Sequence, residues 1–135
     1  MNTPAQRPVE LILARNLLAS LSTAAFLVSG PGEIIFFNEA AGSLLGKRFE
    51  ECGTMSPEEW TGIFGPFDED GQPIPVEEQP LTAMLRANRP GHAVYRIRSA
   101  SGADRDIEAS ALPIVGVDGF RGAMVFFWPL TEDGR

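Results

Sequence analysis

His92 is the only histidine in the chain, so any metal, haem or acid–base chemistry that needs an imidazole must use it. It follows Gly91 at the predicted start of a strand, a position that favours a surface histidine at the end of a hairpin. The alternative is a small α+β enzyme in which His92 works with a carboxylate, Asp104 or Asp106. A serine or cysteine hydrolase would need a nucleophile beside this base, and no such pattern surrounds it. We therefore predict no catalytic residue.

Cys52 is likewise the only cysteine, which excludes an intrachain disulfide and any metal site built from several cysteines. A reducing cytoplasm is consistent with this. In the segment Glu51-Cys52-Gly53-Thr54 we predict an ordinary loop thiol, not a redox or photoactive one.

An acidic segment contains Asp68, Asp70 and Gln72, which alternate as the oxygen ligands of a calcium loop do. Pro73 and Pro75 disturb this alternation, and no EF-hand helix pair surrounds it. We therefore predict a solvated turn here and no metal site anywhere in the chain.

The composition limits the classes of function. The chain has 135 residues, 44% of them apolar, which suits one domain with a sizeable core. With 11 basic and 18 acidic residues, its formal charge of −7 argues against direct nucleic-acid binding. The N-terminal residues lack the pattern of a signal peptide, and no apolar run approaches the ~20 residues of a membrane helix. We predict a cytoplasmic protein without membrane insertion.

The first part of the chain combines helical and strand patterns. Two short apolar runs, 24–28 and 34–37, are separated by Gly-Pro-Gly and predict a pair of strands. Asn38 then caps a short helix that stops at Gly46. Before these strands, spacings of three and four predict an amphipathic helix over residues 9–21, whose apolar stripe is Val9, Ile12, Leu13, Leu17 and Leu21.

The second part of the chain begins with helices and ends with strands. Ser56-Pro57 and Pro80 each open a helix. From His92 the period changes to two, which predicts a hairpin that turns at Ser101-Gly102, and residues 123–128 form a last strand. This order predicts an α+β domain with one antiparallel five-stranded sheet, helices on one face of it and the amphipathic N-terminal helix.

A family resemblance is carried by residues 32–46, Gly-Glu-Ile-Ile-Phe-Phe-Asn-Glu-Ala-Ala-Gly-Ser-Leu-Leu-Gly. This stretch resembles the G-x-I-x-x-x-N-x-A-A-x-x-L-x-G pattern of PAS sensory domains, with Gly32, Asn38 and Gly46 as its structural residues. The loop 67–75, followed by Pro80-Leu81, looks like the segment before the long PAS helix. The similarity covers roughly residues 22–131. It implies a flanking helix in 1–21, a PAS domain in 22–131 and a tail in 132–135.

The resemblance implies a non-catalytic sensory and protein-interaction module that regulates an effector domain or partner, such as a kinase, cyclase or transcriptional regulator. The sequence departs from the family pattern at two places. One is the end of the last strand, where the link to an effector begins in the family, and the other is the hairpin. Pro129-Leu130-Thr131 stands where the family commonly has an Asp-Ile-Thr-like triplet, and Ala100-Ser101-Gly102 followed by Arg105-Asp106 stands where Lys-Asp-Gly and Arg-Trp are frequent.

The resemblance also raises the alternative of a haem- or flavin-binding sensor. Haem-binding relatives normally place the iron ligand on or near the long helix, whereas His92 comes after it. Flavin-binding light sensors resemble Asn-Cys-Arg-Phe-Leu-Gln at the reactive site, and the segment at Cys52 shares only the cysteine. The sequence therefore requires no cofactor.

A ligand pocket is predicted where small residues leave room. Alternation places Arg96 and Arg98 on the outward face of their strand. The inward alanines of the next strand leave space for a small apolar ligand, although the long helix could instead pack closer over them. The predicted pocket residues are Met84, Leu85, Tyr95, Ile97, Ala109, Ala111, Met124 and Phe126.

The apolar stripe of the N-terminal helix must be covered by something. It can pack on its own sheet or pair with the same helix of a second copy across a two-fold axis. Because flanking helices often build the dimer in PAS domains, the resemblance implies a homodimer.

Overall fold

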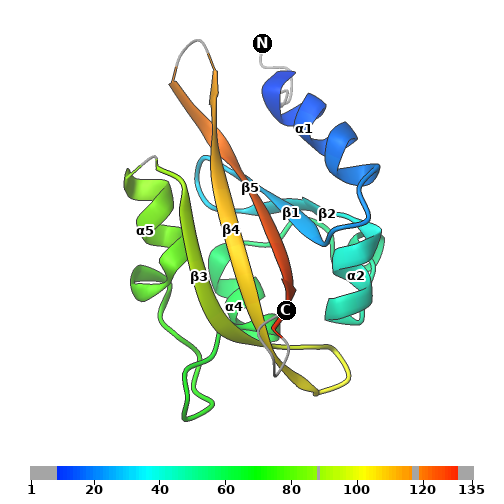
Figure 1. Cartoon of the computed structure of the whole chain (residues 1–135), viewed down its shortest axis with the longest axis vertical. Coiled ribbons are helices and arrows are strands. Elements are labelled where there is room, and N and C mark those ends of the chain that lie inside the picture. The colour runs from blue at the N-terminus through cyan, green and yellow to red at the C-terminus, as the bar shows by residue number, and fades with distance from the viewer. Residues whose placement is uncertain (1–8, 88, 117–118, 131–135) are drawn as a thin grey trace, which may run out of the picture.

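The computed structural model describes residues 9–87, 89–116 and 119–130. Its elements in chain order are α1 (Val9–Ala19), β1 (Ala25–Ser29), β2 (Ile34–Phe37), α2 (Glu39–Leu45), α3 (Phe49–Cys52), α4 (Pro57–Phe64), a 3₁₀ turn η1 (Val76–Glu78), α5 (Pro80–Ala87), β3 (Gly91–Arg98), β4 (Asp104–Gly116) and β5 (Gly119–Pro129) (Figure 1). The predicted order of helices and strands is confirmed, with α3 and η1 as additions.

The five strands form one antiparallel sheet in the order β2-β1-β5-β4-β3, which confirms the predicted fold class. The last strand therefore lies in the middle, between the first strand and the β3–β4 hairpin. Figure 1 shows α5 alongside β3 and α4 behind the central strands.

Each face of the sheet has its own hydrophobic cluster. On the inner face, residues of all five strands pack under α2 and α4; they include Val28, Phe37, Ile97, Ile107, Ala109, Val125 and Phe127. On the outer face, α1 packs over β1 and β2; this outer cluster is Leu11, Ala14, Leu18, Ala25, Leu27, Ile35 and Phe36. Because side chains alternate along a strand, most neighbouring strand residues lie in different clusters. Ile35 and Phe36 of β2 are an exception, since both lie in the outer cluster and the pairing of β2 with β1 is irregular.

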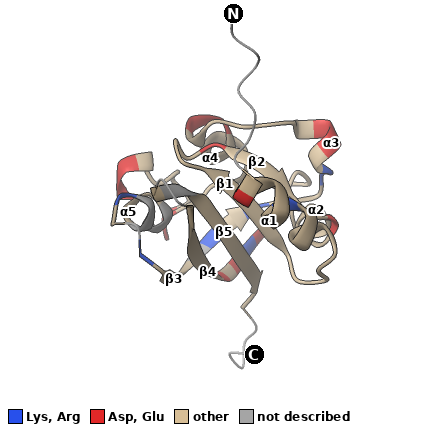
Figure 2. Ribbon diagram, turned by 90° about the horizontal axis from the view of Figure 1, so that it is seen from above, with Lys and Arg blue, Asp and Glu red and all other residues tan. Residues whose placement is uncertain are grey.

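Side-chain caps fix the helix ends that the sequence predicts. The Asn38 carboxamide oxygen accepts a hydrogen bond from the Ala41 N–H at the start of α2, and Gly46 ends this helix in the left-handed conformation at φ 80°. At α4, Ser56 and Glu59 form the reciprocal pair of a capping box. Acidic residues also gather in the first turns of α3 and α4 (Figure 2).

The outward orientation of Arg96 and Arg98 is confirmed. Their guanidinium groups donate to Asp106 and Asp104 on the neighbouring strand, each at 2.9 Å, while Ile97 between them is buried. These exposed cross-strand ion pairs stabilise the hairpin only slightly.

The prediction for α1 needs a correction. The helix ends at Ala19, and the residues that it buries are Leu11, Ala14 and Leu18. Most of the predicted apolar stripe lies on the opposite side, with Val9, Ile12, Leu13 and Leu17 between 47% and 62% exposed. Leu21, which follows the helix, packs against the outer cluster. The helix is apolar on nearly every side, so spacing alone could not tell which side faces the sheet.

Candidate ligand cavity and surface sites

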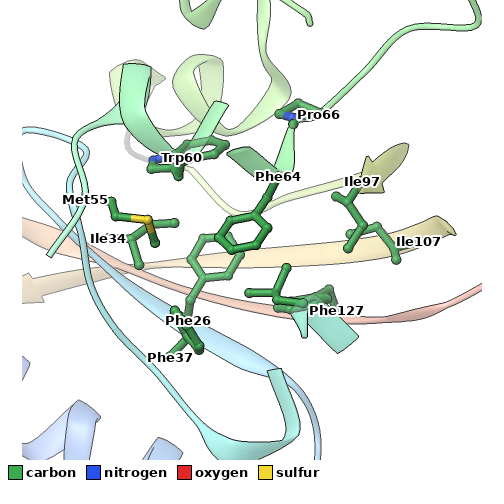
Figure 3. Close-up of a pocket in the computed structure, with 12 residues that line it drawn as sticks. Phe26, Ile34, Phe37, Met55, Trp60, Phe64, Pro66, Ile97, Ile107 and Phe127 are labelled. Carbon is green, nitrogen blue, oxygen red and sulfur yellow. The ribbon is translucent and has the colours of Figure 1, made fainter. Parts of the chain in front are cut away.

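An apolar cavity of about 40 Å³ lies between the inner face of the sheet and the helices that cover it (Figure 3). The strands contribute Phe26, Ile34, Phe37, Ile97, Ile107 and Phe127. The helices and loops contribute Leu45, Met55, Trp60, Phe64, Gly65 and Pro66. Every lining residue in the described part of the chain is therefore apolar.

The helix α4 supplies the aromatic roof of this cavity. Trp60 and Phe64 are four residues apart, so both side chains project from one face of the helix. The capping box at Ser56 fixes where this helix begins and thus where the two rings point. On the floor, the rings of Phe26 and Phe127 from neighbouring strands pack at a centroid distance of 5.6 Å.

Two buried polar atoms near α4 lack a hydrogen-bond partner. One is Nε1 of Trp60, whose side chain lines the cavity; the other is Oε1 of Gln79, which is 1% exposed. The Gln79 amide nitrogen donates to Oγ1 of Thr61 at 2.8 Å and to the Ile74 carbonyl at 2.9 Å. Since that carbonyl can only accept, these bonds fix the orientation of the Gln79 amide.

The structure brings together part of the predicted pocket. Ile97 lines the cavity, and Ala109 and Ala111 are buried in the inner cluster without lining it. The side chains of Met84, Leu85 and Tyr95 lie outside the described part of the structure.

The placement of Met124 and Phe126 is the reverse of the predicted one. Both pack against the outer cluster, under α1. The register explains this, since Ala109 lies opposite Phe127 and Ala111 opposite Val125. Residues directly opposite in an antiparallel pair share a face, so Val125 and Phe127 face inward with the alanines.

Several lining residues lie outside the pocket that the sequence predicts. The aromatic residues Trp60 and Phe64 carried a usable signal, because their spacing of four follows the predicted helix start at Ser56-Pro57. No sequence pattern indicates Phe26 or Phe127. Each lies in a short apolar run in which the inward-facing and outward-facing residues are equally apolar.

His92 pairs with Glu108, and not with Asp104 or Asp106, the carboxylates of the alternative small-enzyme interpretation. Its Nε2 lies 3.0 Å from Oε2 of Glu108, and the other oxygen of this carboxylate accepts from Trp128 Nε1 at 2.7 Å. Asp104 and Asp106 bind the two arginines instead. The imidazole is exposed and is not among the residues that line the cavity. In the described residues, no group of histidine, cysteine and carboxylate side chains could hold a metal ion.

Neither haem nor flavin fits the cavity lining. The sole histidine is outside it, and Cys52 lies at the end of α3, half-buried against the inner cluster but not in the lining. A flavin ring carries several carbonyl and N–H groups that need hydrogen-bond partners when buried. Among the side chains of the described lining residues, the single nitrogen or oxygen atom is Trp60 Nε1, and the space is far smaller than a flavin.

Cys52 should react slowly with iodoacetamide near neutral pH. Burial raises the pKa of this thiol above its ordinary value, and Lys47 only partly offsets that effect. Because the thiolate is the nucleophile, a raised pKa means less reactive thiolate at pH 7.5. We expect alkylation several-fold slower than that of glutathione, with a rate that rises steeply at alkaline pH. Alkylation in urea serves as the control, and a native rate equal to that of glutathione would contradict the prediction.

The exposed side of α1 is apolar. Val9, Ile12, Leu13 and Leu17 form it, and the helix has only two charged residues, Glu10 and Arg15 (Figure 2). The Arg15 guanidinium lies over the Phe36 ring, 4.8 Å from its centre, at the edge of the packed side. No helix in the described residues is long and apolar enough to cross a membrane.

No family model and no curated protein matches the chain in sequence. Solved structures do match it in fold. A PAS domain from a two-component sensor histidine kinase has 18% identity and a TM-score of 0.61, covering 90% of this chain and 96% of that one. The PAS domain of the fruit-fly ELK potassium channel has 12% identity and a TM-score of 0.70, covering 90% and 98%. The LOV protein of Rhodobacter sphaeroides has 16% identity and a TM-score of 0.73, covering 95% and 71%.

Proposed function

We propose that this chain, which has the PAS fold, is a non-catalytic sensory and protein-interaction module that links an apolar cavity to a dimer-forming helix. One observation carries the proposal. The cavity and α1 lie on opposite faces of the same two strands, β1 and β5. The module would regulate an effector domain or partner protein through the geometry of the dimer.

Adjacent residues provide the route between the two faces. Phe26 lines the cavity and its neighbour Leu27 packs under α1; on β5, Phe127 lines the cavity and Phe126 packs under α1. A ligand that displaces either inner ring therefore also shifts the strand on which α1 rests. Such a ligand changes the equilibrium between two arrangements only by its difference in affinity for them.

Binding in the cavity is tested by native mass spectrometry of freshly purified protein, with a visible absorbance spectrum of the same sample. We expect a small bound molecule without a visible band, because the lining suits neither haem nor flavin. A chromophore band would contradict the cavity assignment. Hydrogen exchange then tests the link, since a cavity ligand should change the protection of α1; unchanged protection would contradict it.

The uncovered side of α1 is the proposed contact with a second copy. Its four aliphatic residues are about half exposed or more, and burying them would be favourable by roughly 25 cal/mol per Å². Because a two-fold axis brings the same face of each copy together, the aliphatic residues of one helix would meet those of the other.

Leu13→Glu should convert a dimer into a monomer. The side chain is 62% exposed, so the substitution costs the single chain little stability but places a carboxylate in the proposed interface. We expect at least a tenfold weaker self-association by analytical ultracentrifugation. The matched control is Ile63→Glu on α4, where the side chain is 48% exposed on the other side of the molecule. Equal association of the two variants would contradict this interface.

A further inference from the structure

The lining of the cavity sets the charge of its ligand. The described side chains around it come from Phe, Ile, Leu, Met, Trp and Pro residues, none of which can pair with an ion. Burying an unpaired charge among such groups is prohibitive, and each unpaired polar group is costly. The ligand that suits this cavity is therefore neutral and mostly hydrocarbon.

One lining residue, Trp60, has a buried polar atom without a hydrogen-bond partner. Trp60 is more than nine-tenths buried, and its Nε1 has no acceptor. Buried indole N–H groups usually have a partner, and one left without it destabilises the folded protein. Figure 3 shows the indole ring among the lining side chains, with its nitrogen at the end nearer Met55.

We propose that the cavity binds a small uncharged molecule with one hydrogen-bond acceptor, which accepts from Nε1 of Trp60. This inference rests on the proposed function of the cavity as a ligand site. A ketone, aldehyde, ester or ether oxygen on a compact hydrocarbon meets the description. The acceptor satisfies the indole N–H while the hydrocarbon part contacts the phenyl rings of Phe26, Phe64 and Phe127.

The cavity also limits the size of this molecule. An engineered cavity of about 150 Å³ takes up benzene. The space here is about 40 Å³, so even a single ring must displace lining side chains. Met55 is suited to yield, because its unbranched side chain has several rotatable bonds. A ligand that moves lining side chains in this way can also move the strands that carry them, and through these strands affect α1.

Two ring-sized probes test the acceptor directly. Cyclopentanone and methylenecyclopentane have nearly the same shape and differ in a C=O against a C=CH₂ group. Their dissociation constants are measured by NMR titration of the full chain and of Trp60→Phe. The matched control is Trp128→Phe, because Trp128 donates to Glu108 and does not line the cavity.

We expect the preference for the ketone over the alkene to fall about two- to tenfold in Trp60→Phe and to stay unchanged in Trp128→Phe. In the unsubstituted chain, the Trp60 indole N–H resonance should shift with the ketone and much less with the alkene, a readout that does not depend on the folding of a variant. Binding of both probes with the same preference in all three chains, and no ketone-specific shift, would overturn the acceptor and leave the cavity as a ligand site. Binding of neither probe at millimolar concentration would overturn both.

Discussion

Replacing Asn38 by alanine should lower the free energy of unfolding by about 3–5 kcal/mol. The side chain is 2% exposed and joins three segments. Its Oδ1 accepts from the N–H groups of Ala25 and Ala41, at 3.1 and 3.0 Å. Its Nδ2 donates to the carbonyls of Leu18 and Thr23, at 2.9 and 2.8 Å. Alanine removes this partner from all four backbone groups. The Leu18 carbonyl still accepts from the Leu21 N–H, and each buried group left unpaired costs about 1 kcal/mol or more.

The matched control for Asn38→Ala is Ser56→Ala, which removes the cap of α4. This cap is exposed, so water can replace the lost bond and the cost should be about 1 kcal/mol. Urea unfolding followed by circular dichroism measures both. Asn38→Asp separates the accepted from the donated hydrogen bonds. A carboxylate still accepts from the N–H groups of Ala25 and Ala41 but cannot donate to the carbonyls of Leu18 and Thr23. If Asn38→Ala costs no more than Ser56→Ala, the side chain does not tie these segments together as described.

The role of Asn38 shows how far local sequence reasoning reaches. Its position before Glu39-Ala40-Ala41 predicts the cap of α2, and the structure confirms it. Its bonds to Leu18 and Thr23 cross 20 and 15 residues of chain and depend on where α1 ends against the sheet. Such bonds follow from tertiary packing, and no local pattern indicates them.

The same limit explains the candidate cavity. Residues 123–128 are apolar without alternation, so the sequence cannot tell which of Phe126 and Phe127 faces inward. The pairing of β5 with β4 decides it, and a shift of one residue would exchange the two faces completely. In contrast, β3 alternates arginines with apolar residues, so the sequence correctly predicts that Ile97 faces inward.

The β1–β5 pair that separates the cavity from α1 leads to the second large expected effect. Gly122 has φ +152° and lies opposite Ser29 on β1. A Cβ atom there would collide with the carbonyl oxygen of Val28 and lie 3.3 Å from Cδ2 of Leu11. The carbonyl belongs to the strand backbone at Val28, which is fully buried, and it cannot rotate away. We expect Gly122→Ala to lower the free energy of unfolding by about 3–5 kcal/mol, because backbone strain and overpacking add.

Gly62→Ala adds the same methyl group but should raise the free energy of unfolding, where Gly122→Ala lowers it. Gly62 lies in α4 with open space around its Cα, so alanine gains helix propensity and should stabilise the protein by up to about 1 kcal/mol. Urea unfolding of both variants then separates the effect of the site from that of adding a methyl group. Because α1 rests on β1, loosening the pair at Gly122 should also raise hydrogen exchange in α1 more than in α4. A Gly122→Ala protein as stable as the unsubstituted chain would show that β1 and β5 do not approach this closely.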